Sequence, residues 1–132
     1  REGNDITLVS YGVLLNELFT AAELLGRKGI SAEIIKLNTI SPLDVEAVAA
    51  SAEKTGGLLV LEDCVENGSV GQRLTTELAK RSALPRTILL KNLGNDYTAQ
   101  GSVSLLRKAK ALDGASIAAA VEEALGHGEK AT

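Results

Sequence analysis

The sequence predicts a three-layer α/β/α domain built on a mostly parallel sheet of four to five strands. Short apolar segments rich in β-branched residues alternate with longer segments in which apolar residues recur at helical spacing. The joints between these segments are short, and neither an internal repeat nor a low-complexity segment interrupts them. This alternation is typical of a parallel sheet covered by helices on both faces.

The first strand is predicted at residues 6–10 (ITLVS), which are apolar and β-branched. A helix follows, because apolar residues recur at i, i+3, i+7 and i+10 from position 15 onward. Lys28 and Gly29 are predicted to end this helix with a cation and a residue that readily takes positive φ. Residues 31–40 (SAEIIKLNTI) contain the second strand.

The motif SPLD predicts the start of a second helix. Ser41 suits the N-cap, Pro42 suits the first helical position, and the carboxylate of Asp44 can accept the exposed amides. Gly56 and Gly57 are predicted to end the helix. Its expected buried face consists of Val45, Val48, Ala49 and Ala52.

The second half of the chain predicts two more strands and three helices. Residues 58–62 (LLVLE) form a continuous apolar run, which is typical of a strand buried on both faces. Residues 87–91 (TILLK) form the fourth strand, and a helix starts near Ser102. Asp113 is predicted to cap the last helix. The helix between the third and fourth strands has its apolar face at Val70, Leu74 and Leu78.

Length and composition predict one globular domain. The 132 residues are 45% hydrophobic and 23% charged, enough for a core without disulfides or metals. We expect residues 1–5 to be a linker or a remnant of an edge strand, residues 6–126 to be the domain, and residues 127–132 to be a flexible tail. Methionine is absent, which suggests a domain from a longer protein.

The charge pattern argues against several classes of function. The net charge is −3, no Lys/Arg stripe is visible, and only three aromatic residues occur, so nucleic-acid binding is not expected. No apolar run approaches the length of a membrane span, and no signal peptide is present. We therefore expect a cytoplasmic protein.

The segment EDCVENGSVGQR, residues 62–73, raises the question of phosphate binding. It lacks the lysine of a Walker loop and the third glycine of a dinucleotide fingerprint, and its acids would repel a phosphate. Ser69 and Gln72 instead have the spacing of a capping box, in which the glutamine side chain accepts the serine amide. Gly68 allows a sharp turn, and Gly71 leaves room for a close approach to the helix start.

The same segment offers little for catalysis. Cys64 has no histidine partner, because the only histidine, His127, lies in the tail, and one Cys with one His supports no zinc site. We expect an inert, half-buried thiol. Glu62 and Asp63 could act as acid and base, but most such pairs are solvated loop charges. A hydrolase is the least favoured class, since no Ser or Cys has a credible base.

The order of the segments DITLVSYG, GISAEIIKLNTISPLD, TGGLLVLED…GSVGQRL and DYTAQGSVSLLRKAKALDGASIAAAV resembles the C-terminal domain of transketolase-like, thiamine-diphosphate-dependent enzymes over about residues 1–125. The lead-in REGND, the turn DYTAQG and the ending LDGASI favour 1-deoxy-D-xylulose-5-phosphate synthase, which joins pyruvate to glyceraldehyde 3-phosphate with release of CO2. A transketolase, or a split transketolase subunit, and the beta subunit of 2-oxo-acid dehydrogenases are the alternatives.

This resemblance implies that the chain itself binds no cofactor and no metal and carries no catalytic residue. Thiamine diphosphate and magnesium would be bound by upstream domains, whose Gly-Asp-Gly motif does not occur here. The domain would complete the enzyme by packing on those upstream domains and supporting a homodimer. The family fold also adds an antiparallel edge strand before residue 1, of which part would be missing. Several relatives carry Pro-Asp in the loop where this chain has Asn95, Asp96 and Tyr97, which leaves the role of that loop open.

Contacts with the rest of the enzyme are expected at the carboxyl ends of the parallel strands. The predicted interface rim consists of Tyr11, Gly12, Asn38, Thr39, Glu62, Asp63, Glu66, Gly68, Ser69, Gly71, Asn95, Asp96 and Gln100. A free-standing regulatory domain that binds a small ligand at this rim is the alternative from another class. Ordinary turn chemistry would also account for such residues.

Overall fold

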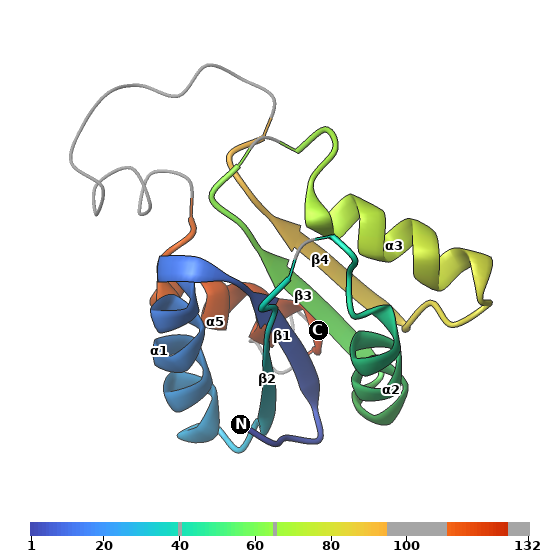
Figure 1. The fold of residues 1–132 in the computed structure, drawn as a ribbon. Coiled ribbons are helices and arrows are strands. Elements are labelled where there is room, and N and C mark those ends of the chain that lie inside the picture. The colour runs from blue at the N-terminus through green and yellow to red at the C-terminus, as the bar shows by residue number, and fades with distance from the viewer. Residues whose placement is uncertain (40, 65, 95–110, 127–132) are drawn as a thin grey trace.

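Four parallel strands form the sheet in the computed structural model, which describes residues 1–39, 41–64, 66–94 and 111–126 (Figure 1). Their order across the sheet is β2-β1-β3-β4. The strands are β1 (Ile6–Ser10), β2 (Ala32–Lys36), β3 (Gly57–Leu61) and β4 (Thr87–Lys91). In register, Leu8 of β1 lies between Ile34 of β2 and Leu59 of β3, and Leu59 also pairs with Leu89 of β4.

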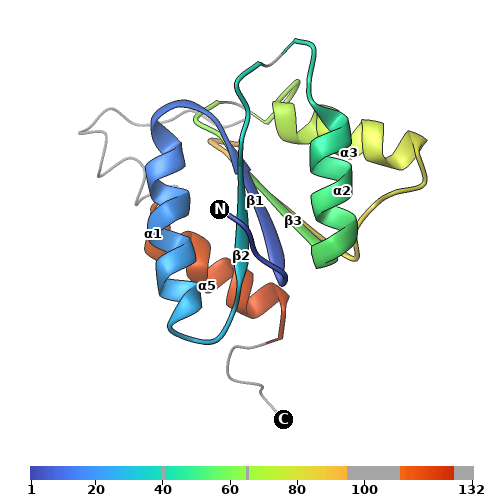
Figure 2. The same cartoon turned by 60° about the horizontal axis from the view of Figure 1, so that its bottom comes forward.

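Helices cover both faces of this sheet, so the predicted three-layer α/β fold is confirmed (Figures 1 and 2). On one face lie α1 (Leu15–Gly26), preceded by the 3-10 helix η1 (Gly12–Leu14), and α5 (Gly114–Ala124). On the other face lie α2 (Val45–Thr55) and α3 (Val70–Lys80).

Two apolar clusters hold the layers together. Leu18 of α1 and Ile117 of α5 are fully buried with Leu59 on one side of the sheet. Val48 of α2 and Leu74 of α3 are fully buried on the other side. Since every residue of β1 and β3 is buried, the two central strands have no solvent-facing side. This is why they read as continuous apolar runs.

The start of α2 differs from the prediction. Asp44, and not Ser41, is the N-cap, and its side chain accepts the amide of Ala47 at 3.2 Å. Aspartate caps as well as serine does, and its charge also suits the positive end of a helix. At the other end, Gly56 takes a φ of +77° as predicted, but Gly57 already belongs to β3.

The end of α1 also differs in detail. The helix stops at Gly26, three residues before the predicted Gly29. The amides of Lys28 and Ile30 both donate to the carbonyl oxygen of Leu25, at 2.9 and 3.0 Å, and close the helix there. Gly29 does take a positive φ, +78°, in the turn that leads back into the core.

Residues 1–5 run along the outer side of β2. The amide of Ile34 donates to the Arg1 carbonyl oxygen at 2.9 Å, and the amide of Asp5 donates to the Ser31 oxygen at 2.8 Å. The partner number falls as the residue number rises, so this segment runs antiparallel to β2. That direction fits a remnant of an edge strand, although the segment itself is not a strand.

Two further predictions lie outside the described residues: the helix near Ser102 and the tail at 127–132. Within the part of the chain that the structure describes, no helix is both long and apolar enough to cross a lipid bilayer.

Candidate functional site

The carboxyl ends of β1 and β3 meet where the strand order reverses. The chain moves from β1 outward to β2, returns to β3, and then moves outward the other way to β4. In open α/β sheets, ligands commonly bind in the crevice at such a reversal. Tyr11 immediately follows β1 here and Glu62 immediately follows β3, so these two residues occupy the place where a ligand would be sought.

Glu62 fills this position with its own carboxylate. Its Oε1 accepts the amide of Val70 and its Oε2 accepts the amide of Gly71, both at 2.8 Å. The Tyr11 hydroxyl donates to Oε1 at 3.0 Å. Glu62 itself is only 2% exposed. Glu62 is therefore not the solvated loop charge that is typical of such acids. It is a buried anion at the positive end of α3.

Gly71 leaves the space that this carboxylate needs. A Cβ at this position would lie 2.8 Å from Cδ2 of Leu90 and 3.2 Å from Oε2 of Glu62. The predicted close approach at Gly71 is thus confirmed, and the approaching group comes from the chain itself.

Only one of the two hydrogen bonds of the predicted capping box is present. Ser69 is the N-cap of α3, and its hydroxyl accepts the amide of Gln72 at 3.2 Å. The Gln72 side chain, however, accepts the amide of Gly68 at 3.1 Å and not that of Ser69. The Ser69 amide instead donates to the Glu66 carbonyl oxygen at 3.1 Å, so its hydrogen bond is made without the Gln72 side chain.

Burial and the Glu62 charge raise the pKa values of two neighbouring groups, the Tyr11 hydroxyl and the Cys64 thiol. Burial, followed by the nearby carboxylate of Glu62, raises the pKa of the Tyr11 hydroxyl well above its ordinary value. The same two causes raise the pKa of the Cys64 thiol, which lies 3.6 Å from Oε1 of Glu62. Both groups are held in their neutral, protonated form. Cys64 therefore has the character of the half-buried inert thiol that the sequence predicts.

Neighbouring backbone fixes the loop after Glu62. The Glu62 amide donates to the Lys91 carbonyl oxygen at 2.8 Å, and the Leu93 amide donates to the Cys64 carbonyl oxygen at 2.9 Å. The Glu66 amide donates to the Gly94 carbonyl oxygen at 3.2 Å. The ends of β3 and β4 are therefore tied together at this rim.

These contacts decide what the site can hold. The α3 amides that could bind a phosphate already bind Glu62, whose charge would repel a second anion. No group of three or more His, Cys, Asp or Glu side chains suited to a metal occurs among residues 1–39, 41–64, 66–94 and 111–126. The start of α3 is thus poorly suited to a diphosphate.

Several other predicted rim residues lie apart from the Glu62 carboxylate or outside the described part of the chain. Asn38 and Thr39 are exposed and line a separate hollow with Leu43 and Asp44. Gly12, with a φ of +66°, and Asp63 are also exposed. Asn95, Asp96 and Gln100 lie outside the described residues.

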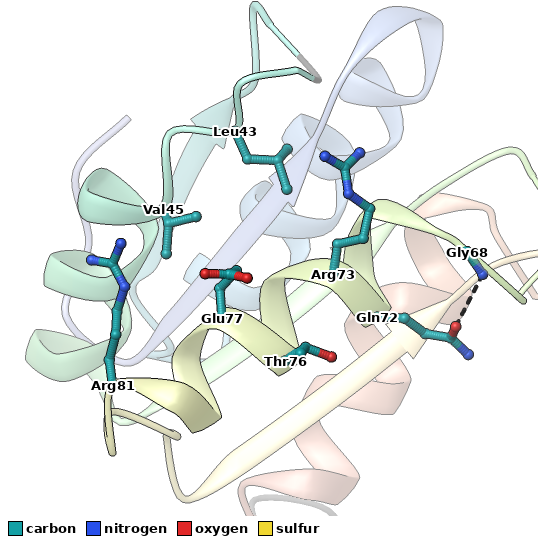
Figure 3. Close-up of a pocket in the computed structure, with 8 residues that line it drawn as sticks. All are labelled: Leu43, Val45, Gly68, Gln72, Arg73, Thr76, Glu77 and Arg81. Atoms are coloured by element: carbon teal, nitrogen blue, oxygen red, sulfur yellow. Dashed lines mark hydrogen bonds between the residues drawn. The ribbon is translucent and has the colours of Figure 1, made fainter.

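A second hollow, of about 540 Å³, lies between the start of α2 and the exposed side of α3 (Figure 3). Leu43 and Val45 supply apolar lining. Arg73 and Glu77 of α3 and its C-cap residue Arg81 follow one another at intervals of four residues. The sequence prediction missed this site. The available signal was Arg73, a cation in the first turn of a helix, where a positive charge is disfavoured.

Comparison with known proteins adds the family. The model of the family described as "Transketolase, C-terminal domain" matches residues 1–117. Over 84 residues, or 64% of this chain, the sequence is 44% identical to the pyruvate dehydrogenase E1 component subunit beta of Staphylococcus epidermidis and 40% identical to that of Staphylococcus aureus. The matched part is 26% of each relative, so the chain spans about a quarter of their length.

Solved structures show the same fold. A structure described as a split-gene transketolase in an inactive beta4 tetramer has a TM-score of 0.83 at 24% identity, covering 96% of this chain and 40% of that one. A transketolase from Pichia stipitis has a TM-score of 0.61 at 16% identity, covering 96% and 17%. The synthase suggested by the sequence gains no specific support from these matches, which favour the alternatives.

Proposed function

The chain belongs to the transketolase C-terminal domain family, and on that premise we propose that it is the C-terminal domain of a thiamine-diphosphate-dependent 2-oxo-acid dehydrogenase beta subunit. The observation that carries this proposal is the 44% identity over 84 residues to a pyruvate dehydrogenase E1 beta subunit. The likeness to transketolases rests on lower identity and supports the fold alone.

The proposed role is assembly and not chemistry. The Glu62 carboxylate already occupies the α3 amides, and the Tyr11 and Cys64 groups beside it are held protonated. Among the described rim residues, the amides of Val70 and Gly71 are therefore not free for an anion, and neither Tyr11 nor Cys64 is an activated nucleophile. Thiamine diphosphate, when bound elsewhere in the enzyme, would supply the carbanion chemistry, while this domain packs against the parts that bind it.

The rim at the carboxyl ends of the strands is the surface proposed for that packing. Tyr11, Glu62 and Ser69 contribute rigidity there because all three are hydrogen-bonded within the domain. Gly12, Asn38 and Asp63 are exposed and available for contacts. A rigid rim costs little entropy on association.

Domain exchange tests this proposal. The chain would replace the matching segment of the Staphylococcus epidermidis E1 beta subunit, and parallel grafts would be made in a transketolase and in 1-deoxy-D-xylulose-5-phosphate synthase. We expect the dehydrogenase graft, combined with its partner subunit, to assemble and to reduce an artificial electron acceptor with pyruvate. The same subunit without the domain is the control. Activity in the synthase graft alone would favour the synthase, and activity in the transketolase graft alone would favour a transketolase. A failure of all three to assemble would favour a free-standing domain.

A further inference from the structure

Among the described residues that line the hollow between α2 and α3, one charged side chain makes no ion pair. Arg81 pairs with Glu46, and Glu77 pairs with Lys80 at 3.2 Å. Within the described residues, the Arg73 side chain makes no ion pair and no hydrogen bond.

The position of Arg73 is unfavourable for the isolated domain. It is the fourth residue of α3, near the positive end of the helix dipole, where a cation lowers helix stability. The cations at the far end of the helix, Lys80 and Arg81, are placed favourably by the same rule. The helix dipole therefore does not favour an arginine at position 73.

Apolar side chains lie beside Arg73 in the hollow. Its guanidinium points from α3 toward Leu43 (Figure 3), and Val45, which is 8% exposed, continues the apolar lining. Gln72 also lines the hollow, but its side chain turns away from Arg73 toward Gly68, whose amide its Oε1 accepts at 3.1 Å (Figure 3).

From these contacts we infer that the hollow binds a carboxylate of a partner polypeptide, carried by an acidic residue next to an apolar one. The planar guanidinium of Arg73 matches a carboxylate with two parallel hydrogen bonds, and the apolar neighbour packs on Leu43 and Val45. A single unpaired cation balances one negative charge. A phosphate dianion would bring a second negative charge that no other unpaired cation among the described lining residues balances.

A peptide suits the hollow better than a free small acid. The site lies open between two helices, so a small acid would keep most of its contact with water and bind weakly. An arginine beside an apolar wall at a surface hollow is also the kind of residue that dominates protein–protein contacts. The inference concerns this surface of the domain and holds whichever enzyme the domain completes.

NMR titration of the ¹⁵N-labelled chain tests it. The probe is N-acetyl-Leu-Glu-amide, and the comparison ligands are N-acetyl-Leu-Gln-amide, acetate and inorganic phosphate. We expect saturable shifts of the Val45, Gly68 and Gln72 amides with the acidic probe, and binding about tenfold weaker with the neutral peptide or with acetate.

Matched variants identify the contact. Arg73→Gln should weaken binding of the acidic probe about tenfold, whereas Arg27→Gln, which removes an exposed arginine from the end of α1, should leave it unchanged. Absence of saturable shifts, equal binding by Arg73→Gln, or equal weakening by Arg27→Gln would each overturn the inference. Tighter binding of phosphate than of the acidic peptide would also overturn it, because the hollow would then be a general anion site.

Discussion

The carboxylate of Glu62 and the backbone of Gly71 form one unit: Oε2 accepts the Gly71 amide at 2.8 Å, and the missing side chain of Gly71 leaves the carboxylate its place. An acid at the end of β3 thereby satisfies the first two amides of α3, eight and nine residues further along the chain. The pair joins strand, loop and helix at the rim where a ligand would otherwise bind.

Glu62→Gln should destabilise the domain by about 1–3 kcal/mol, because the buried amides of Val70 and Gly71 lose a charged acceptor. Urea unfolding monitored by circular dichroism measures this difference. Asp63→Asn is the matched control, since its exposed side chain should change the free energy of unfolding by less than about 0.5 kcal/mol. Equal effects of the two substitutions would contradict the role given to Glu62.

Gly71→Ala should destabilise the domain although alanine favours helices. The added Cβ would lie 2.8 Å from Leu90 and 3.2 Å from Glu62, an overpacking that costs more than the gain of about 1 kcal/mol in helix propensity. We expect a net loss of about 1–2 kcal/mol in urea unfolding. Gly26→Ala, in α1, meets only the flexible end of Arg1 at 3.8 Å and should be neutral or mildly stabilising. Stabilisation by both substitutions would show that a Cβ at position 71 can be accommodated, which would contradict the close packing described there.

Cys64 should react slowly with iodoacetamide at pH 8, because burial and then the Glu62 charge raise the pKa of the thiol. Removing the charge with Glu62→Gln should lower that pKa and speed alkylation by about threefold or more. The measurement is the alkylation rate as a function of pH, followed by mass spectrometry. An unchanged pH profile in Glu62→Gln would refute the coupling.

Glu33 should contribute stability that depends on pH. Burial alone would raise its pKa, but hydrogen bonds from Lys54, Ser51 and the Gly3 amide outweigh burial and lower the pKa below its ordinary value of 4.5. A lowered folded-state pKa adds stability above the ordinary value, and that stability is lost as the pH falls through the folded-state value. Because Lys54 is 46% exposed, its ion pair adds little by itself.

Glu33→Gln should therefore cost about 1–2 kcal/mol at pH 7. The cost should shrink as the pH falls below about 4.5, the ordinary value for this group. Urea unfolding of both proteins between pH 3 and pH 7 compares the two curves. A constant difference over this range would mean that packing, and not charge, accounts for the effect of Glu33.

Much of the fold follows from local sequence. The apolar run at residues 6–10 and the aspartate at position 113 predict β1 and the cap of α5 correctly, because strand burial and capping depend on near neighbours. The start of α2 was harder to predict, since Ser41 and Asp44 both suit an N-cap and only the three-dimensional path selects Asp44.

The candidate site is harder to predict from the sequence than the fold. The spacing of Ser69 and Gln72 predicts a cap. Glu62, however, accepts a hydrogen bond from Tyr11, which is 51 residues earlier in the chain and is brought close by the pairing of β1 with β3. No local pattern distinguishes such an acid from a solvated one. The family resemblance extends over most of the chain, whereas the choice of the synthase depends on short segments such as REGND and DYTAQG, and the matches do not specifically support it.

The central claim is that this domain completes the enzyme while other domains bind the cofactor. Calorimetric titration of the 132-residue chain with thiamine diphosphate in the presence of magnesium tests it most directly. With the α3 amides already bound to Glu62, we predict no saturable heat at millimolar cofactor. Saturable binding at micromolar cofactor would show that this domain holds the cofactor itself, and would contradict its assignment as the part of the enzyme that only completes the assembly.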